Sequence, residues 1–86
     1  MDPAICIEAE QARLSERIAK AEEHVSECLR RLAEQREVVE ELERHGRPAA
    51  TAKRALVSLA ATQRLAEDYY GHLLKQLNRA LNADVN

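Results

Sequence analysis

The stretch ERHGRPAAT, residues 43–51, holds one of the two glycines and one of the two prolines of this 86-residue chain. Gly46 suits the left-handed position just past a helix end, and Arg44 and His45 sit where cations favour the C-terminal dipole. Pro48 suits the first turn of a new helix, where a missing N–H does no harm. A stop signal and a start signal this close predict a tight reversal between two antiparallel helices.

Upstream of this turn, apolar residues recur with the seven-residue spacing of a coiled coil. The two rows are Ile7, Leu14, Ala21, Cys28, Gln35 and Leu42, and Gln11, Ile18, Val25, Leu32 and Val39. Asp2 can cap a helix that begins near Pro3, and no glycine or proline follows before the turn. The pattern predicts one helix over residues 4–45, with the turn at residues 46–47.

Downstream of the turn the same period returns. Its rows are Leu56, Gln63, Tyr70 and Leu77, and Ala52, Leu59, Ala66, Leu73 and Ala80. They predict a second helix over residues 48–81, and the mostly polar residues 82–86 are expected to fray. The sequence therefore predicts a single all-α domain over residues 1–86, an antiparallel two-helix hairpin of coiled-coil type.

The turn also indicates which residues of the two helices meet. If Leu42 faces Leu56, the numbers of paired residues sum to about 98, and Gln35 meets Gln63. A buried pair of amides lowers stability but penalises slipped registers, in which each amide would lose its partner. This match supports the predicted register.

Two helices bury only a ribbon of surface, and a chain of 86 residues without disulfides or metal has difficulty offsetting its ordering entropy. Apolar residues beyond the seam are left over for a partner: Leu65, Tyr69, Leu74, Leu81, Leu29 and Val38. We expect a homodimer that forms a four-helix bundle, in preference to a monomer with scattered exposed leucines. A stable monomer would instead leave these residues as a site for another protein.

The charges are unevenly divided along the chain. Residues 1–46 carry 12 acidic and 7 basic side chains, and residues 47–86 carry 3 acidic and 6 basic ones, so the two halves attract. Four basic residues at or after the turn suggest nucleic-acid binding as an alternative function: Arg47, Lys53, Arg54 and Arg64. The sequence pI of 5.9 and the lack of interleaved aromatic residues argue against nucleic acid as a partner.

No pattern of catalytic chemistry is present. The chain has no glycine-rich phosphate loop and no nucleophile motif, and adjacent carboxylates such as Glu22 and Glu23 point about 100° apart on a helix. Acidic residues instead match basic residues four positions on: Glu16–Lys20, Glu27–Arg31 and Glu40–Arg44. We therefore expect no enzyme activity, no catalytic residue and no small-molecule substrate.

The stretch AEDYYGHLL, which begins at Ala66, holds both tyrosines and His72. His72, together with His24 and Cys28, suggests a metal site. The set lacks a fourth ligand, so we expect neither metal nor cofactor. Tyr69 fits a partner-binding patch, because tyrosine is enriched at interfaces, and it also fits ordinary packing. Whether Tyr69 and His72 serve function or packing stays open at this point.

The location of the protein follows from the ends of the chain and its cysteines. The first residues, MDPAICIEAE, lack the basic region and apolar run of a signal peptide, and no stretch approaches the ~18 apolar residues of a membrane span. Cys6 and Cys28 match no zinc spacing, and on one helix they lie too far apart to bond. Reduced thiols fit a cytoplasmic protein without membrane contact, which is our expectation.

Residues 17–77 also resemble a known group of proteins. A Q-R-x-x-V-x-x-L run precedes a glycine turn, and an Ala/Leu-rich helix with a late histidine and closing leucines follows. The matching residues are Gln35, Arg36, Val39, Leu42, Gly46, His72, Leu74 and Leu77. In these features the chain is similar to small uncharacterised helical-hairpin proteins of α-proteobacteria. The resemblance implies a helical hairpin and carries over no functional residue.

Overall fold

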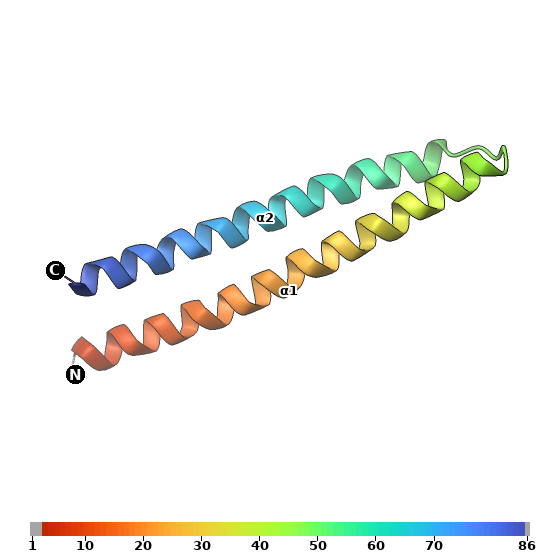
Figure 1. The fold of residues 1–86 in the computed structure, drawn as a ribbon. Helices are drawn as coiled ribbons and strands as arrows, with labels where there is room; N and C mark the ends of the chain where they lie inside the picture. The colour runs from red at the N-terminus through yellow and green to blue at the C-terminus, as the bar shows by residue number, and fades with distance from the viewer. Residues whose placement is uncertain (1–2, 86) are drawn as a thin grey trace.

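The chain folds as a hairpin of two long antiparallel helices (Figure 1). The structure, a computed structural model, describes the backbone of residues 3–85 and the side chains of residues 8–83. Helix α1 spans Pro3–Arg44 and helix α2 spans Ala50–Val85, with no strand among the described residues. The molecule measures 66 × 17 × 15 Å. The predicted all-α hairpin is confirmed.

The helix boundaries differ from the predicted ones mainly in the second helix. Helix α1 lies within one residue of the predicted range 4–45 and begins at Pro3 as its fixed φ favours. Helix α2 begins two residues later than predicted and continues to Val85. Residues 82–85, which were predicted to fray, are part of α2 in the structure. Asp2 and Asn86 lie outside the described residues.

The end of α1 is closed by a pair of backbone hydrogen bonds around Gly46. The N–H of Gly46 donates to the carbonyl of Glu43 at 3.1 Å, and the N–H of Arg47 donates to the carbonyl of Leu42 at 2.9 Å. Gly46 has a φ of 65°, the left-handed conformation that glycine adopts without steric cost. This is the Schellman arrangement, so the predicted role of Gly46 is confirmed.

The connection between the helices is longer than the predicted two-residue turn. Residues 45–49 lie outside both helices, and Figure 1 shows this segment running back beside the end of α1 before α2 begins. The N–H of Lys53 donates to the carbonyl of Ala49 at 2.8 Å, which closes the first turn of α2. The start of α2 is therefore displaced along α1, away from the tip of the hairpin.

This displacement makes the predicted register wrong. The Gln35 amide donates to the carbonyl of Ala52 at 3.0 Å, and Gln63 donates to Glu67 at 2.8 Å, so the two glutamines do not meet. Ala52 lies roughly 16 Å along α2 from Gln63, at a rise of 1.5 Å per residue. The Arg17–Tyr69 hydrogen bond gives a similar register, because its residue numbers sum to 86 and those of Gln35 and Ala52 sum to 87, not to 98. The ion pair of Lys53 with Glu43 next to the turn sums to 96, and it is spanned by two long side chains.

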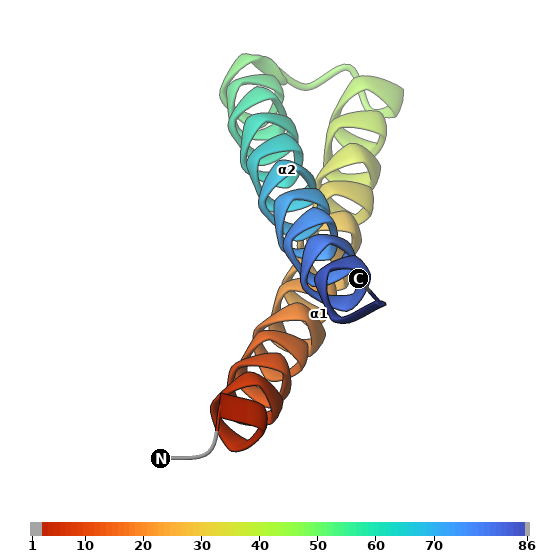
Figure 2. The same ribbon diagram turned by 90° about the vertical axis from the view of Figure 1, so that its left-hand side faces the viewer.

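The buried core is thin and lies on the predicted heptad rows. The buried residues are all apolar or cysteine: Ala21, Cys28, Leu32, Val39, Ala66 and Leu73. Within residues 8–83, Leu73 alone is fully enclosed, with no exposed surface. Viewed from the end of the hairpin, the helices cross and exchange sides along their length (Figure 2), as expected when a seven-residue repeat keeps the seam in contact.

Replacing Gly46 tests the cap. No atom lies within 4 Å of a Cβ built at Gly46, so Gly46→Ala creates no clash, only the strain of a left-handed alanine. We expect the free energy of unfolding to fall by about 1–2 kcal/mol in urea titrations followed by circular dichroism. Gly46→Asn is the matched control, since asparagine tolerates this conformation, and it should be less damaging. Equal effects of both variants would contradict the assigned cap.

Replacing Leu73 tests the seam. Leu73→Asp places a carboxylate at a fully enclosed position, and we expect loss of the native helical signal in circular dichroism. The milder Leu73→Ala should lower the free energy of unfolding by about 2–5 kcal/mol. Leu65→Asp is the control, because 70% of Leu65 is exposed, and it should keep the native helicity. A Leu73→Asp variant that stays fully helical would overturn the seam described above.

Candidate interaction surface

The hairpin has two lateral sides. Residues of the heptad rows line the contact between the helices, and we call them seam positions. Whether a residue follows or precedes a seam position decides which side it lies on. Successive helical residues point about 100° apart, so a residue that follows a seam position and one that precedes it flank the seam on opposite sides. Glu43 and Lys53, which both follow seam positions, pair across the helices at 3.7 Å. Arg17 and Tyr69, which both precede seam positions, bond across the helices at 3.0 Å. Residues of both helices therefore sort consistently into these sides.

The first side, which we call the leucine side, is defined by residues that follow seam positions. Its large apolar members are all exposed: Leu29, Val57, Leu74 and Leu81. Small apolar residues occupy other positions of the same kind: Ala12, Ala19, Ala33 and Ala60. The leucine side thus carries exposed apolar residues along much of its length, interspersed with charged residues that follow seam positions in the same way: Glu8, Glu22, Arg36, Glu40, Glu43, Lys53, Arg64 and Glu67.

The second side, which we call the tyrosine side, is defined by residues that precede seam positions. Its large apolar members are Val38, Leu65 and Tyr69, again all exposed. The Arg17 guanidinium donates to the Tyr69 hydroxyl, and both border a surface hollow of about 250 Å³ lined also by Lys20, Ala21 and His24. This side is therefore more polar, and its aromatic residue already has a hydrogen-bond partner.

The six residues predicted as an interaction face are exposed but do not form one face. Leu65 and Tyr69 lie on the tyrosine side, and Leu74 and Leu81 lie on the leucine side. Leu65 and Leu74 are nine residues apart, which places them about 180° apart around α2. Leu29 and Val38 are divided between the sides of α1 in the same way, since they too are nine apart. Two separate surfaces replace the single predicted one.

The basic residues proposed as an alternative nucleic-acid contact do not form a free basic patch. Lys53 pairs with Glu43, and Arg54 donates to the Thr51 hydroxyl at 3.2 Å. Arg47 lies in the segment between the helices, and Arg64 lies on α2 about 16 Å beyond Lys53 at the helical rise. A neutralised lysine and scattered arginines give no continuous positive stripe for a phosphate backbone.

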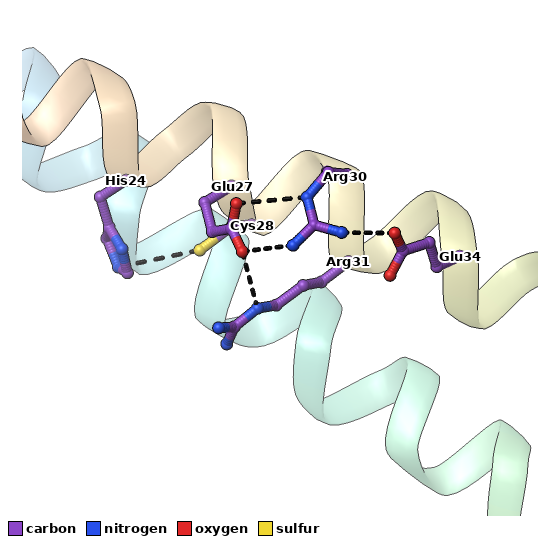
Figure 3. A network of polar contacts seen from close by, with 6 residues as sticks. All are labelled: His24, Glu27, Cys28, Arg30, Arg31 and Glu34. Atoms are coloured by element: carbon purple, nitrogen blue, oxygen red, sulfur yellow. Dashed lines mark hydrogen bonds and ion pairs between the residues drawn. The ribbon is translucent and has the colours of Figure 1, made fainter.

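His24 and Cys28 are neighbours, as their spacing of four predicts. The Cys28 sulfur lies 3.7 Å from Nε2 of His24, and the free thiol of Cys28 is buried on the seam (Figure 3). His72 precedes a seam position on the exposed part of α2, and in the observed register it does not lie level with His24. Among the described residues no group of three or more histidine, cysteine or acidic side chains is placed to hold a metal ion.

The densest polar network lies on the exposed face of α1 beside Cys28 (Figure 3). The Arg30 guanidinium donates to Glu27 at 3.2 Å and also to Glu34, and Arg31 pairs with Glu27 at 3.3 Å. The hydrogen bond from Arg30 lowers the pKa of Glu27 below its ordinary value and raises the pKa of Arg30. Two adjacent arginines, Arg30 and Arg31, thus converge on the Glu27 carboxylate.

Two of the three predicted ion pairs along α1 form. Glu16–Lys20 forms at 3.9 Å and Glu27–Arg31 at 3.3 Å. The predicted Glu40–Arg44 pair is wrong, because Arg44 bonds Glu41 at 2.8 Å. Sequence reasoning also missed the pairing of Arg30 with Glu27 and Glu34, although both partners sit at favourable helical spacings of three and four.

The lowered pKa of Glu27 predicts a pH-dependent contribution to stability. A carboxyl whose pKa is lower in the folded state stabilises the fold above its unfolded pKa, and this contribution is lost as the pH falls through the folded value. We expect Glu27→Gln to have a lower melting temperature than the wild type at pH 7. The difference should disappear as the pH is lowered from about 5 to 3.

Glu23→Gln is the control for this experiment, since Glu23 makes no ion pair among the described residues and its loss removes the same charge. A difference between wild type and Glu27→Gln that persists at pH 3 would show that the carboxylate is not its source.

No helix within residues 3–85 combines the length and the apolar character needed to cross a membrane. Comparison of the chain with profiles of known protein families, with curated proteins and with solved structures found no match. The arguments for function therefore rest on the surface of the hairpin itself.

Proposed function

We propose that this protein is a small helical interaction module, an adaptor or regulator without catalytic chemistry, that first pairs with a second copy of itself. Two hairpins would form a four-helix bundle, in which each helix gains a second neighbour. A further protein partner would then bind the surfaces that remain outside the bundle. The proposal rests on the amount and kind of surface that a single hairpin leaves exposed.

The accessible surface of the hairpin carries this proposal. The single chain exposes 6686 Å². A compact folded monomer of 9.7 kDa would expose about 5,100 Å², by the scaling of surface with mass. The excess, roughly 1,600 Å² per chain, is about twice the ~800 Å² that each partner loses in a standard-size interface and matches the larger interfaces of permanent homodimers.

The distribution of large apolar side chains supports the same proposal. Among the described side chains of residues 8–83, six residues are buried in the seam and seven large apolar residues are exposed. Fully burying an exposed leucine or valine contributes on the order of 1.5–3 kcal/mol, and the leucines and valines here, which are 41–71% exposed, would contribute a fraction of that before the costs of ordering are subtracted. Self-association therefore enlarges a core that is thin for a chain of 86 residues.

Other features fit a module of this kind in the cytoplasm. Cys28 is a free, buried thiol, which is typical of a reducing compartment. The described residues include no group of three or more histidine, cysteine or acidic side chains placed to hold a metal ion, and several charged residues pair along α1. Tyr69 and Val38 on the tyrosine side would serve a different protein partner, because tyrosine is enriched at interfaces.

Sedimentation equilibrium over a wide concentration range, with reductant present, tests the proposal. We expect a species of twice the chain mass of 9.7 kDa, dissociating only on dilution. The reductant ensures that a dimer held by cysteine oxidation is not counted. A stable species of one chain mass at every concentration would contradict self-association and leave both apolar sides open to other partners.

A further inference from the structure

We infer that the second copy docks on the leucine side of the hairpin, with the turns of both copies at the same end. In this arrangement α1 of one copy packs against α2 of the other. The inference rests on the proposed self-association and adds to it the docking surface and the orientation of the two copies.

The choice of side follows from the exposed apolar residues. The leucine side carries the larger set: Leu29, Val57, Leu74 and Leu81, which are 41–71% exposed. The alanines between them leave room for the larger side chains of a facing helix. On the tyrosine side, Tyr69 is already bonded to Arg17, and the adjoining hollow is bordered by Lys20 and His24. Both sides also carry charged residues, so the choice rests on the exposed large apolar side chains, of which the leucine side has four and the tyrosine side three.

The area involved fits a second copy. If each chain removes its excess of roughly 1,600 Å², the dimer interface buries about 3,200 Å² in total, within the range of permanent homodimers. The leucine side extends over most of a molecule 66 Å long, so it can provide such an interface when two hairpins lie side by side. A small or strongly curved partner would cover only part of it.

The charge of the two helices decides the orientation. In a two-fold dimer with the axis along the hairpin, α1 of each copy meets α2 of the other. With the axis across the hairpin, α1 meets α1 and α2 meets α2. The half of the chain that contains α1 carries 12 acidic and 7 basic side chains, and the other half carries 3 and 6. The axis along the hairpin therefore brings opposite charges together, and both turns then lie at the same end.

One opposite-charge pair in the middle of the leucine side fits this orientation, while the same register brings two like-charge pairs, Arg36 with Lys53 and Glu22 with Glu67, to within about 3 Å along the axis. Glu22 and Arg64 both follow seam positions, and neither has an ion pair within the part of the chain that the structure describes. In the register set by the Gln35–Ala52 contact, Glu22 lies level with residue 65, about 1.5 Å along the axis from Arg64. The same-end arrangement places Glu22 of one copy beside Arg64 of the other.

Matched surface variants test the docking side. Leu29→Gln with Leu74→Gln alters the leucine side, and Val38→Gln with Leu65→Gln makes equivalent changes on the tyrosine side. Glutamine is a good helix former, so both proteins should keep native helicity. We expect the leucine-side pair to raise the dimer dissociation constant in sedimentation equilibrium by roughly 100-fold, and the tyrosine-side pair to leave it unchanged.

The outcomes separate this inference from the proposal beneath it. A wild-type protein that is monomeric overturns self-association itself. A wild-type dimer that is disrupted by the tyrosine-side pair, or by neither pair, leaves self-association standing and overturns the docking side. The mass is interpreted only for variants that keep their helicity in circular dichroism. If the leucine-side double variant loses its helicity, the single variant Leu74→Gln takes its place, with the same expected and contradicting results.

A distance measurement tests the orientation. A nitroxide attached through a ketone-bearing unnatural amino acid in place of Arg47 leaves both cysteines untouched and sits between the helices near the tip. Pulsed electron paramagnetic resonance on the dimer should give a distance well below half of the 66 Å length of the hairpin. A distance approaching that full length would show that the turns lie at opposite ends and would overturn the same-end arrangement.

Discussion

The hydrogen bond from the N–H of Arg47 to the carbonyl of Leu42 determines how the rest of the molecule is arranged. It holds Gly46 in the left-handed conformation and turns the chain back beside α1. The length of the returning segment then sets where α2 begins and which residues meet across the seam. Gln35 consequently meets Ala52, Arg17 meets Tyr69, and the partition of the surface into two sides follows.

Most of the fold could be predicted from the sequence, because it depends on local rules. The seven-residue period predicts two helices and their buried rows, and Gly46 predicts where the first helix ends. The register could not be predicted in this way. A heptad pattern fits its partner almost equally well after a slip of half a repeat or more, and the coincidence of Gln35 with Gln63 favoured the wrong slip. The register depends on the number of residues between the helices, and this number cannot be read from the heptad pattern of the sequence.

The candidate surface was predicted in part. The six residues expected to be left over from the seam are all exposed. Their division into two sides was nevertheless available from the sequence, since Leu65 and Leu74, like Leu29 and Val38, are nine positions apart. The pairing of charged side chains was harder to predict, because several carboxylates lie within reach of one flexible guanidinium. Arg44, for example, pairs with Glu41 and not with Glu40. Such choices depend on rotamers and not on spacing alone.

The thin seam and the exposed leucine side together support an account in which one hairpin is half of the working molecule. Small-angle X-ray scattering tests this claim most directly, because it reports mass and length in one measurement. The account predicts the forward scattering of two chains with a maximum dimension close to the 66 Å length of a single hairpin. The scattering of one chain, or a particle of two chains nearly twice as long, would contradict it.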